Sequence, residues 1–154
     1  MQDKLRNRSD LTMSVRERFS WVWLSALTPV YGLYFGAVLL LRSQGEIANL
    51  TEFGLLSAAA LAQAIILGAG ALLMRARSGR GDRAKPDERD RAIEHRATTA
   101  AYYVLIAGMI VVGCVMPFSH NGWEIVRAAV LAIVIAELVH HGLVVRAYRS
   151  GWQA

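Results

Sequence analysis

Four long apolar runs occupy most of the 154-residue chain and constrain its fold more than any other feature. They cover residues 21–41, 53–74, 97–118 and 123–145, so each is about 21–23 residues long. A helix needs about 20 predominantly apolar residues to cross the ~30 Å hydrocarbon core of a bilayer. The runs therefore predict an all-α integral membrane protein. Because some connections are short, we expect neighbouring helices to run in opposite directions, as an antiparallel four-helix bundle.

The segments outside these runs are too short to form a second folded core. We expect a basic tail at 1–20, a four-helix membrane domain at 21–147 with a loop at 75–96, and a second tail at 148–154. Chains below about 40 residues rarely fold without metals or disulfides. Cys114 is the single cysteine, so an intrachain disulfide is excluded. Any chemistry is therefore expected among the helices or at the membrane surface.

The distribution of basic residues predicts the orientation in the membrane. Of the 17 Lys and Arg residues, five precede the first run, eight lie in the loop at 75–96 and two follow the fourth run. Only Arg42 and Arg127 remain for the opposite side. Basic residues collect on the cytoplasmic side of membrane proteins, so we expect both termini and the loop in the cytoplasm, N-in and C-in. Contact with anionic lipid headgroups accounts for the net charge of +5. No zinc-finger or RNP motif supports binding to nucleic acid.

A charged segment leads into the third apolar run. Asp87, Glu88 and Arg89 follow Pro86 directly. Proline is tolerated in the first turn of a helix, and acidic residues favour the positive end of the helix dipole. We therefore expect a helix that starts near Asp87 in the cytoplasm and enters the membrane further on. The charges either stabilise this helix start and hold headgroups, or form a docking site for a cytoplasmic protein partner together with the loop at 75–96.

The D-E-R triplet before a membrane span resembles a family of small predicted bacterial membrane proteins. Members of that family carry this signature, lack an assigned biochemical role and are often encoded beside small helix-turn-helix regulators. The resemblance covers residues 86–107 of this chain. It implies location in the bacterial inner (cytoplasmic) membrane and a layout of four spans. It implies no substrate and no catalytic residue.

The fourth run contains an intramembrane polar cluster of Glu137, His140 and His141. Spacings of three and four residues predict that both imidazoles lie near the Glu137 side of the helix. A carboxylate at this depth costs about 2.5–3.5 kcal/mol, so it should face the bundle interior. Three interpretations are open: a hydrogen-bonded group that locks helices together, a proton or cation path, and a metal or haem site. A di-iron bundle would need a second E-x-x-H and two more glutamates, so we assign no metal and no cofactor.

Small residues recur every four positions in two of the runs. Gly32 and Gly36 form a G-x-x-x-G in the first run, and Ala128, Ala132 and Ala136 form a stripe in the fourth. Such stripes let helix backbones approach closely. The sequence supports packing within the bundle and homodimerisation equally well.

Motifs for catalysis are missing from the sequence. It contains no H-E-x-x-H, no G-x-S-x-G and no P-loop, so we predict no catalytic residue and no enzyme activity. The favoured function is that of a non-enzymatic accessory or interaction protein. One alternative is a small dimeric transporter or proton-linked channel that uses Glu137, His140 and His141. A second alternative is a haem- or metal-binding membrane component.

Overall fold

The computed structural model describes residues 15–77 and 88–150, and these residues form four long helices. Their bounds are α2 Val15–Gln44, α3 Asn49–Arg77, α4 Glu88–Ile110 and α5 Gly122–Arg149. Most of the predicted N-terminal tail, the centre of the loop at 75–96 and Asp87 of the D-E-R triplet lie outside the described residues. The prediction of an all-α chain with four helices long and apolar enough to span a membrane is confirmed.

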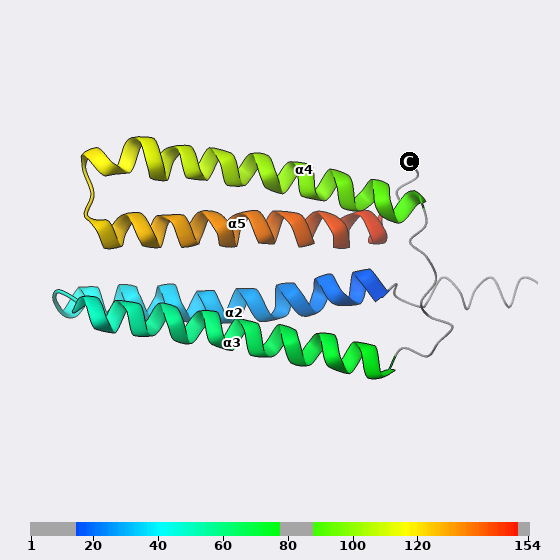
Figure 1. Ribbon diagram of the computed structural model, residues 1–154, viewed down its shortest axis with the longest axis horizontal. Helices are drawn as coiled ribbons and strands as arrows, with labels where there is room; N and C mark the ends of the chain where they lie inside the picture. The colour runs from blue at the N-terminus through cyan, green and yellow to red at the C-terminus, as the bar shows by residue number, and fades with distance from the viewer. Residues whose placement is uncertain (1–14, 78–87, 151–154) are drawn as a thin grey trace, which may run out of the picture.

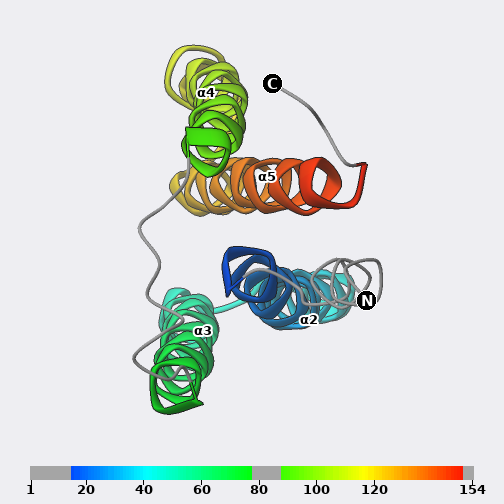
Figure 2. The same cartoon turned by 90° about the vertical axis from the view of Figure 1, so that its right-hand side faces the viewer.

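The helices are arranged as two hairpins whose inner helices meet. α2 and α3 lie side by side and run in opposite directions, and so do α4 and α5 (Figure 1). The two hairpins pack on each other through α2 and α5, so α3 and α4 lie on the outsides of the arrangement (Figure 2). We call the end with residues 45–48 and 119–121 the hairpin end. The opposite end, where α2 begins and α5 ends, is the terminal end.

Local sequence explains where the helices begin and end at the hairpin end. Gly45 follows α2 with a φ of +147°, a conformation that favours glycine over residues with a side chain. Asn121 caps α5: its Oδ1 accepts a hydrogen bond of 3.0 Å from the Glu124 backbone N–H, and its own backbone N–H donates to Glu124 Oε2 at 3.4 Å. This reciprocal capping box satisfies two backbone donors that the helix itself leaves unpaired. It also fixes Glu124 at the start of α5.

α4 changes its winding before the turn into α5. A π-helical segment at Val111–Val115 follows Ile110, and a 3-10 segment at Met116–Phe118 follows that. Pro117 lies within the 3-10 segment. Because proline lacks a backbone N–H, it cannot continue the pattern of α-helical hydrogen bonds, which favours a change of winding here.

Two small clusters of buried apolar side chains lie between the helices, and further buried residues such as Leu27, Ala132 and Val145 lie outside these clusters. Tyr34 and Val38 of α2 pack with Ala59 of α3, and partly buried side chains of the connection and of α5 complete this cluster. In the other hairpin, Ile93 and Ala97 of α4 pack with Val144 of α5. The remaining apolar surface is large, because side chains such as Leu33 and Leu61 are 75% and 64% exposed. Monomeric soluble proteins rarely expose so much apolar surface, and lipid accounts for it readily.

The two stripes of small residues have different surroundings. Ala132 and Ala136 of α5 are buried, and α4 approaches so closely that a Cβ added to Gly108 would lie 2.7 Å from the Cβ of Ala132. Ala128 is half-buried on the same helix. A Cβ added to Gly32 or Gly36 would meet nothing within 4 Å. Among residues 15–77 and 88–150, the G-x-x-x-G of α2 therefore lies outside the contacts between helices. The alanine stripe lies partly at the contact between α4 and α5.

Candidate functional site

The polar cluster predicted in the fourth run lies near the terminal end, where α2, α4 and α5 meet. His141 is buried, with its Nε2 3.5 Å from Glu137 Oε2 on the preceding turn of α5. Its Nδ1 is 3.2 Å from the hydroxyl oxygen of the buried Ser20 on α2. Aromatic rings of α2 lie against the imidazole, with ring centroids at 4.9 Å for Trp23 and 6.3 Å for Phe19. His141 therefore joins α5 to α2 by both polar and ring contacts.

His140 contacts a carboxylate of another helix. Its Nε2 is 3.3 Å from Glu94 Oε1 on α4. Adjacent residues of an α-helix point about 100° apart, so His140 and His141 reach different neighbouring helices. The two imidazoles still touch, with ring centroids 4.7 Å apart and planes at 89°. Glu94, His140, His141 and Glu137 thus form a series of contacting ionisable groups, which we call the terminal-end cluster.

A second polar contact holds the start of α4 to the end of α5. The hydroxyl of Tyr148 donates a hydrogen bond of 2.6 Å to Asp90 Oδ1. Ile93 lies buried one turn further along α4, between this contact and the pair of Glu94 and His140. The first turns of α4 are therefore fixed on α5, while Glu88 and Arg89 of the D-E-R triplet lie exposed on the surface.

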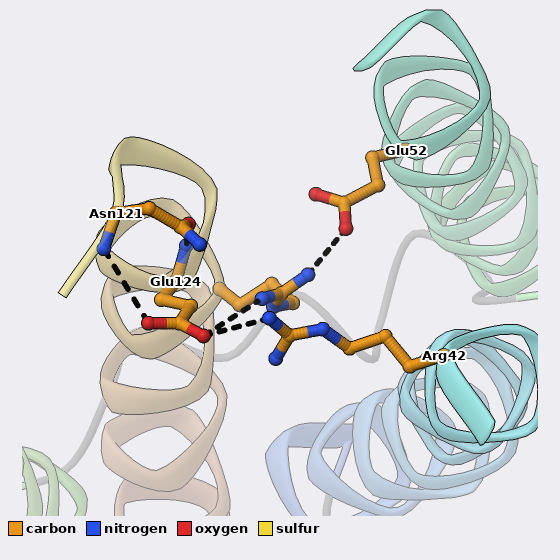
Figure 3. A network of polar contacts seen from close by, with 5 residues as sticks. Arg42, Glu52, Asn121 and Glu124 are labelled. Atoms are coloured by element: carbon orange, nitrogen blue, oxygen red, sulfur yellow. Dashed lines mark hydrogen bonds and ion pairs between the residues drawn. The ribbon is translucent and has the colours of Figure 1, made fainter. Parts of the chain in front are cut away.

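The hairpin end carries an ionic network that the sequence patterns did not predict. They indicated Arg42 and Arg127 only as the two basic residues on that side. Arg42 Nη2 on α2 lies 2.7 Å from Glu124 Oε1 on α5. Arg127 Nη1 on α5 pairs with Glu52 Oε1 on α3, and its Nη2 lies 4.0 Å from Glu124 Oε1. Figure 3 shows Arg42 and Glu52 reaching from α2 and α3 toward the start of α5, where Asn121 and Glu124 lie. We call these four charged residues the hairpin-end network.

The sequence held a signal for this network. Each of the four charged residues lies just outside an apolar run or within its first turns, at the end expected on the same side of the membrane. Two acids and two arginines at one end predict ion pairing there. Which acid pairs with which arginine depends on the order of the helices around the molecule, and the sequence did not provide that order.

Burial divides the hairpin-end network into an inner and an outer pair. The Glu52 and Arg127 side chains are 5% and 11% exposed, whereas Glu124 and Arg42 are 25% and 45% exposed. Removing charges from water is costly unless the geometry and additional hydrogen bonds compensate. Glu52 Oε2 and Arg127 Nη2 have no hydrogen-bond partner within residues 15–77 and 88–150. The inner pair therefore retains one unused acceptor and one unused donor.

A cavity of about 480 Å³ lies beside this inner pair. The C-terminal end of α2, the connection to α3 and the starts of α3 and α5 contribute its lining. The lining residues are Arg42, Glu46, Ile47, Asn49, Glu52, Asn121, Gly122, Trp123, Val126 and Arg127. The cavity thus combines four charged side chains with an aromatic and aliphatic wall.

The described part of the chain contains no group of three or more His, Cys, Asp and Glu side chains that could hold a metal ion. Comparison of the chain with protein-family models, with curated proteins and with solved structures found no match. The fold and its two polar sites therefore define the class on their own: an all-α chain with four candidate membrane-spanning helices and an interhelical ionic site near each end.

Proposed function

We propose that this chain is a non-enzymatic, multi-pass protein of a bacterial inner membrane, which acts as an accessory subunit by binding a cytoplasmic protein partner. The exposed apolar side chains of all four helices support insertion into lipid. The excess of Lys and Arg before the first apolar run, in the loop at 75–96 and after the fourth run supports a cytoplasmic position for both termini and for that loop. The D-E-R resemblance supports the bacterial inner membrane.

The fixed start of α4 is the observation that carries the interaction role. Hydrogen bonding between Asp90 and Tyr148, together with the buried Ile93, holds the first turns of α4 on α5. Arg89 and Arg91 on these turns are exposed. A rigid helix presents charged side chains in a fixed pattern, so a partner loses little conformational entropy when it binds. This geometry suits recognition of an acidic surface by α4 at the membrane boundary.

Site-specific crosslinking tests this role. A photoreactive residue in place of the exposed His95, one turn after Arg91 on α4, is expected to give one discrete crosslinked protein partner in native bacterial membranes. The same partner should co-purify in several mild detergents. The variant R89E/R91E should lose the partner without a change in thermal unfolding. Arg18→Glu, an exposed charge reversal on α2, is the matched control and should keep the partner. Absence of a discrete crosslink at position 95 in every native membrane tested would contradict the role.

The terminal-end cluster supports a second candidate function, a proton or cation path. Glu94, His140, His141 and Glu137 are joined by contacts of 3.3 Å and 3.5 Å and by an edge-to-face contact between the two imidazoles. Ionisable residues inside a membrane commonly mark proton relays. Flux of protons through proteoliposomes should then be lost in Glu137→Gln and kept in Glu46→Gln, a change at the other end. Equal flux in the two variants would remove this candidate.

A further inference from the structure

The end of α5 and the start of α2 form a basic surface at the terminal end. The guanidinium carbon of Arg149 on α5 lies 4.9 Å from the ring centroid of Trp21 on α2, so one side chain rests on the other. Arg146, one turn earlier on α5, is exposed, and so is Arg149. Within residues 15–77 and 88–150, neither guanidinium group forms an ion pair with a carboxylate. Both positive charges are therefore available to an anion from outside the chain.

The ring contact prepares Arg149 to bind that anion. A guanidinium group that lies over an aromatic ring is attracted to the face of the ring and keeps its N–H donors at its edge. Because the contact restricts the side chain in advance, less conformational entropy is lost when an anion binds. A phosphate group can accept from the donors of one guanidinium group in a bidentate arrangement. Arg146 adds a positive charge on the same face of the helix.

The same face of α5 continues into an open apolar surface. Gly142 lies four residues before Arg146, and Ile135 lies seven residues before Gly142, so both share this face of the helix. A Cβ added to Gly142 would meet nothing within 4 Å, and Ile135 is 42% exposed. At 1.5 Å per residue, Gly142 lies about 10 Å along the helix from Arg149. A hydrocarbon chain can therefore pack on Gly142 and Ile135 while a phosphate attached to it lies at Arg149.

From this arrangement we infer that the surface binds one anionic phospholipid. Its phosphate accepts hydrogen bonds from Arg149 beside the charge of Arg146, and one acyl chain lies along Gly142 and Ile135. Net charge selects the lipid, because the ammonium group of phosphatidylethanolamine would lie near two guanidinium groups, whereas phosphatidylglycerol has no positive charge. A free phosphate would leave the apolar part of the surface uncovered. Such a site requires the insertion into lipid proposed above and is independent of the protein partner.

Lipid retention by the full-length protein tests this site. The protein is placed in nanodiscs that contain equal amounts of phosphatidylglycerol and phosphatidylethanolamine, and is then extracted in a mild detergent. Native mass spectrometry measures which lipids remain bound. We expect one retained lipid per chain, with phosphatidylglycerol favoured over phosphatidylethanolamine at least about tenfold, because charged hydrogen bonds and net charge both favour it.

Two variants act on the two parts of the site. Arg149→Gln removes the charged donors that lie over Trp21, so it should reduce the preference for phosphatidylglycerol at least about fivefold. Gly142→Leu leaves every charge in place and fills the open surface that receives the acyl chain, so it should reduce the amount of retained lipid severalfold. An anion held by the arginines alone would not respond to Gly142→Leu.

Each variant has a matched control. Arg96→Gln removes the charge of an exposed arginine on α4. Gly68→Leu adds the same side chain on α3, at a glycine whose added Cβ would also meet nothing within 4 Å. Both controls should retain lipid as the wild type does, and thermal unfolding of all four variants checks that each is folded.

The site is supported if Arg149→Gln and Gly142→Leu both reduce retention of phosphatidylglycerol and their controls do not. It is overturned if the protein in the bilayer retains no lipid, if it retains both lipids equally, or if either variant behaves as its control. Recovery of the protein in solution without detergent would contradict insertion into the membrane, and the site with it.

Discussion

Arg127 lies between two carboxylates that come from different helices. It pairs with Glu52 of α3 in a nearly buried contact and lies 4.0 Å from Glu124 one turn earlier on α5. A buried ion pair contributes little net stability compared with apolar residues of similar size, yet loss of one partner leaves the other charge buried and uncompensated. We expect this pair to hold the start of α3 to the start of α5 at the hairpin end.

Arg127→Leu should reduce the free energy of unfolding by about 3–5 kcal/mol, because Glu52 then remains buried without its partner. The double variant E52L/R127L should recover most of that loss. Reversible unfolding by sodium dodecyl sulfate in detergent micelles, followed by circular dichroism, measures both values. A double variant no more stable than Arg127→Leu would contradict the assigned pairing.

The two histidines of α5 should differ in their contribution to stability. His141 is buried against Trp23 and Ser20, so His141→Ala leaves a cavity and should cost about 2–4 kcal/mol. His140 is 18% exposed and contacts Glu94, which is 47% exposed, so His140→Ala should cost below about 1 kcal/mol. Thermal unfolding of the purified variants ranks the two losses of stability. A larger loss for His140→Ala than for His141→Ala would contradict the contacts assigned to these histidines.

The contact between α4 and α5 depends on small residues at the scale of whole helices. Gly108 of α4 lies so close to Ala132 of α5 that an added Cβ would approach the Ala132 Cβ to 2.7 Å. Such close approach increases packing between helices in lipid, where the hydrophobic effect does not drive association. The close spacing of these two helices thus depends on Gly108, which is not part of either stripe of small residues.

Gly108→Ala should destabilise the protein by about 1–3 kcal/mol, because α4 must move away from α5 to make room for the methyl group. Gly32→Ala on α2 is the matched control, since its new Cβ meets nothing within 4 Å. Alanine favours helices over glycine by about 1 kcal/mol, so the control should be neutral or stabilised. Equal losses of stability in the two variants would argue against a tight contact between α4 and α5.

Sequence patterns predicted the elements better than the contacts between them. The four apolar runs predicted four helices, and the charged segment predicted a helix start near Asp87, where α4 begins at Glu88. α2 already starts at Val15, before the first run, because backbone hydrogen bonding continues into the polar segment that precedes it. An apolar run marks what lipid or protein must cover and does not mark the helix ends.

The candidate sites show the same division between local and long-range information. The contact between Glu137 and His141 follows from a spacing of four along one helix. Partners from other helices, such as Ser20 for His141 and Glu94 for His140, depend on how the hairpins pack. The network of Arg42, Glu52, Glu124 and Arg127 depends on that packing entirely, and so it was found only in the structure.

The account of the whole molecule rests on its distribution of apolar and charged surface. Small cores hold each hairpin together, and most apolar side chains along the four helices face outward. Among the described residues, arginines gather toward the terminal end of the helices, whereas the hairpin end has Arg42 and Arg127, which pair with glutamates. Both features follow if four helices cross a bilayer with the terminal end in the cytoplasm.

Cysteine accessibility is the most direct measurement of this central claim. Single cysteines are placed by Ser119→Cys and Lys85→Cys in a Cys114→Ala background, because Cys114 is exposed. A membrane-impermeant maleimide applied to intact spheroplasts should label the cysteine at position 119 and should reach position 85 only after the membrane is permeabilised. Labelling of both positions from the same side, or recovery of the protein in solution without detergent, would contradict the account.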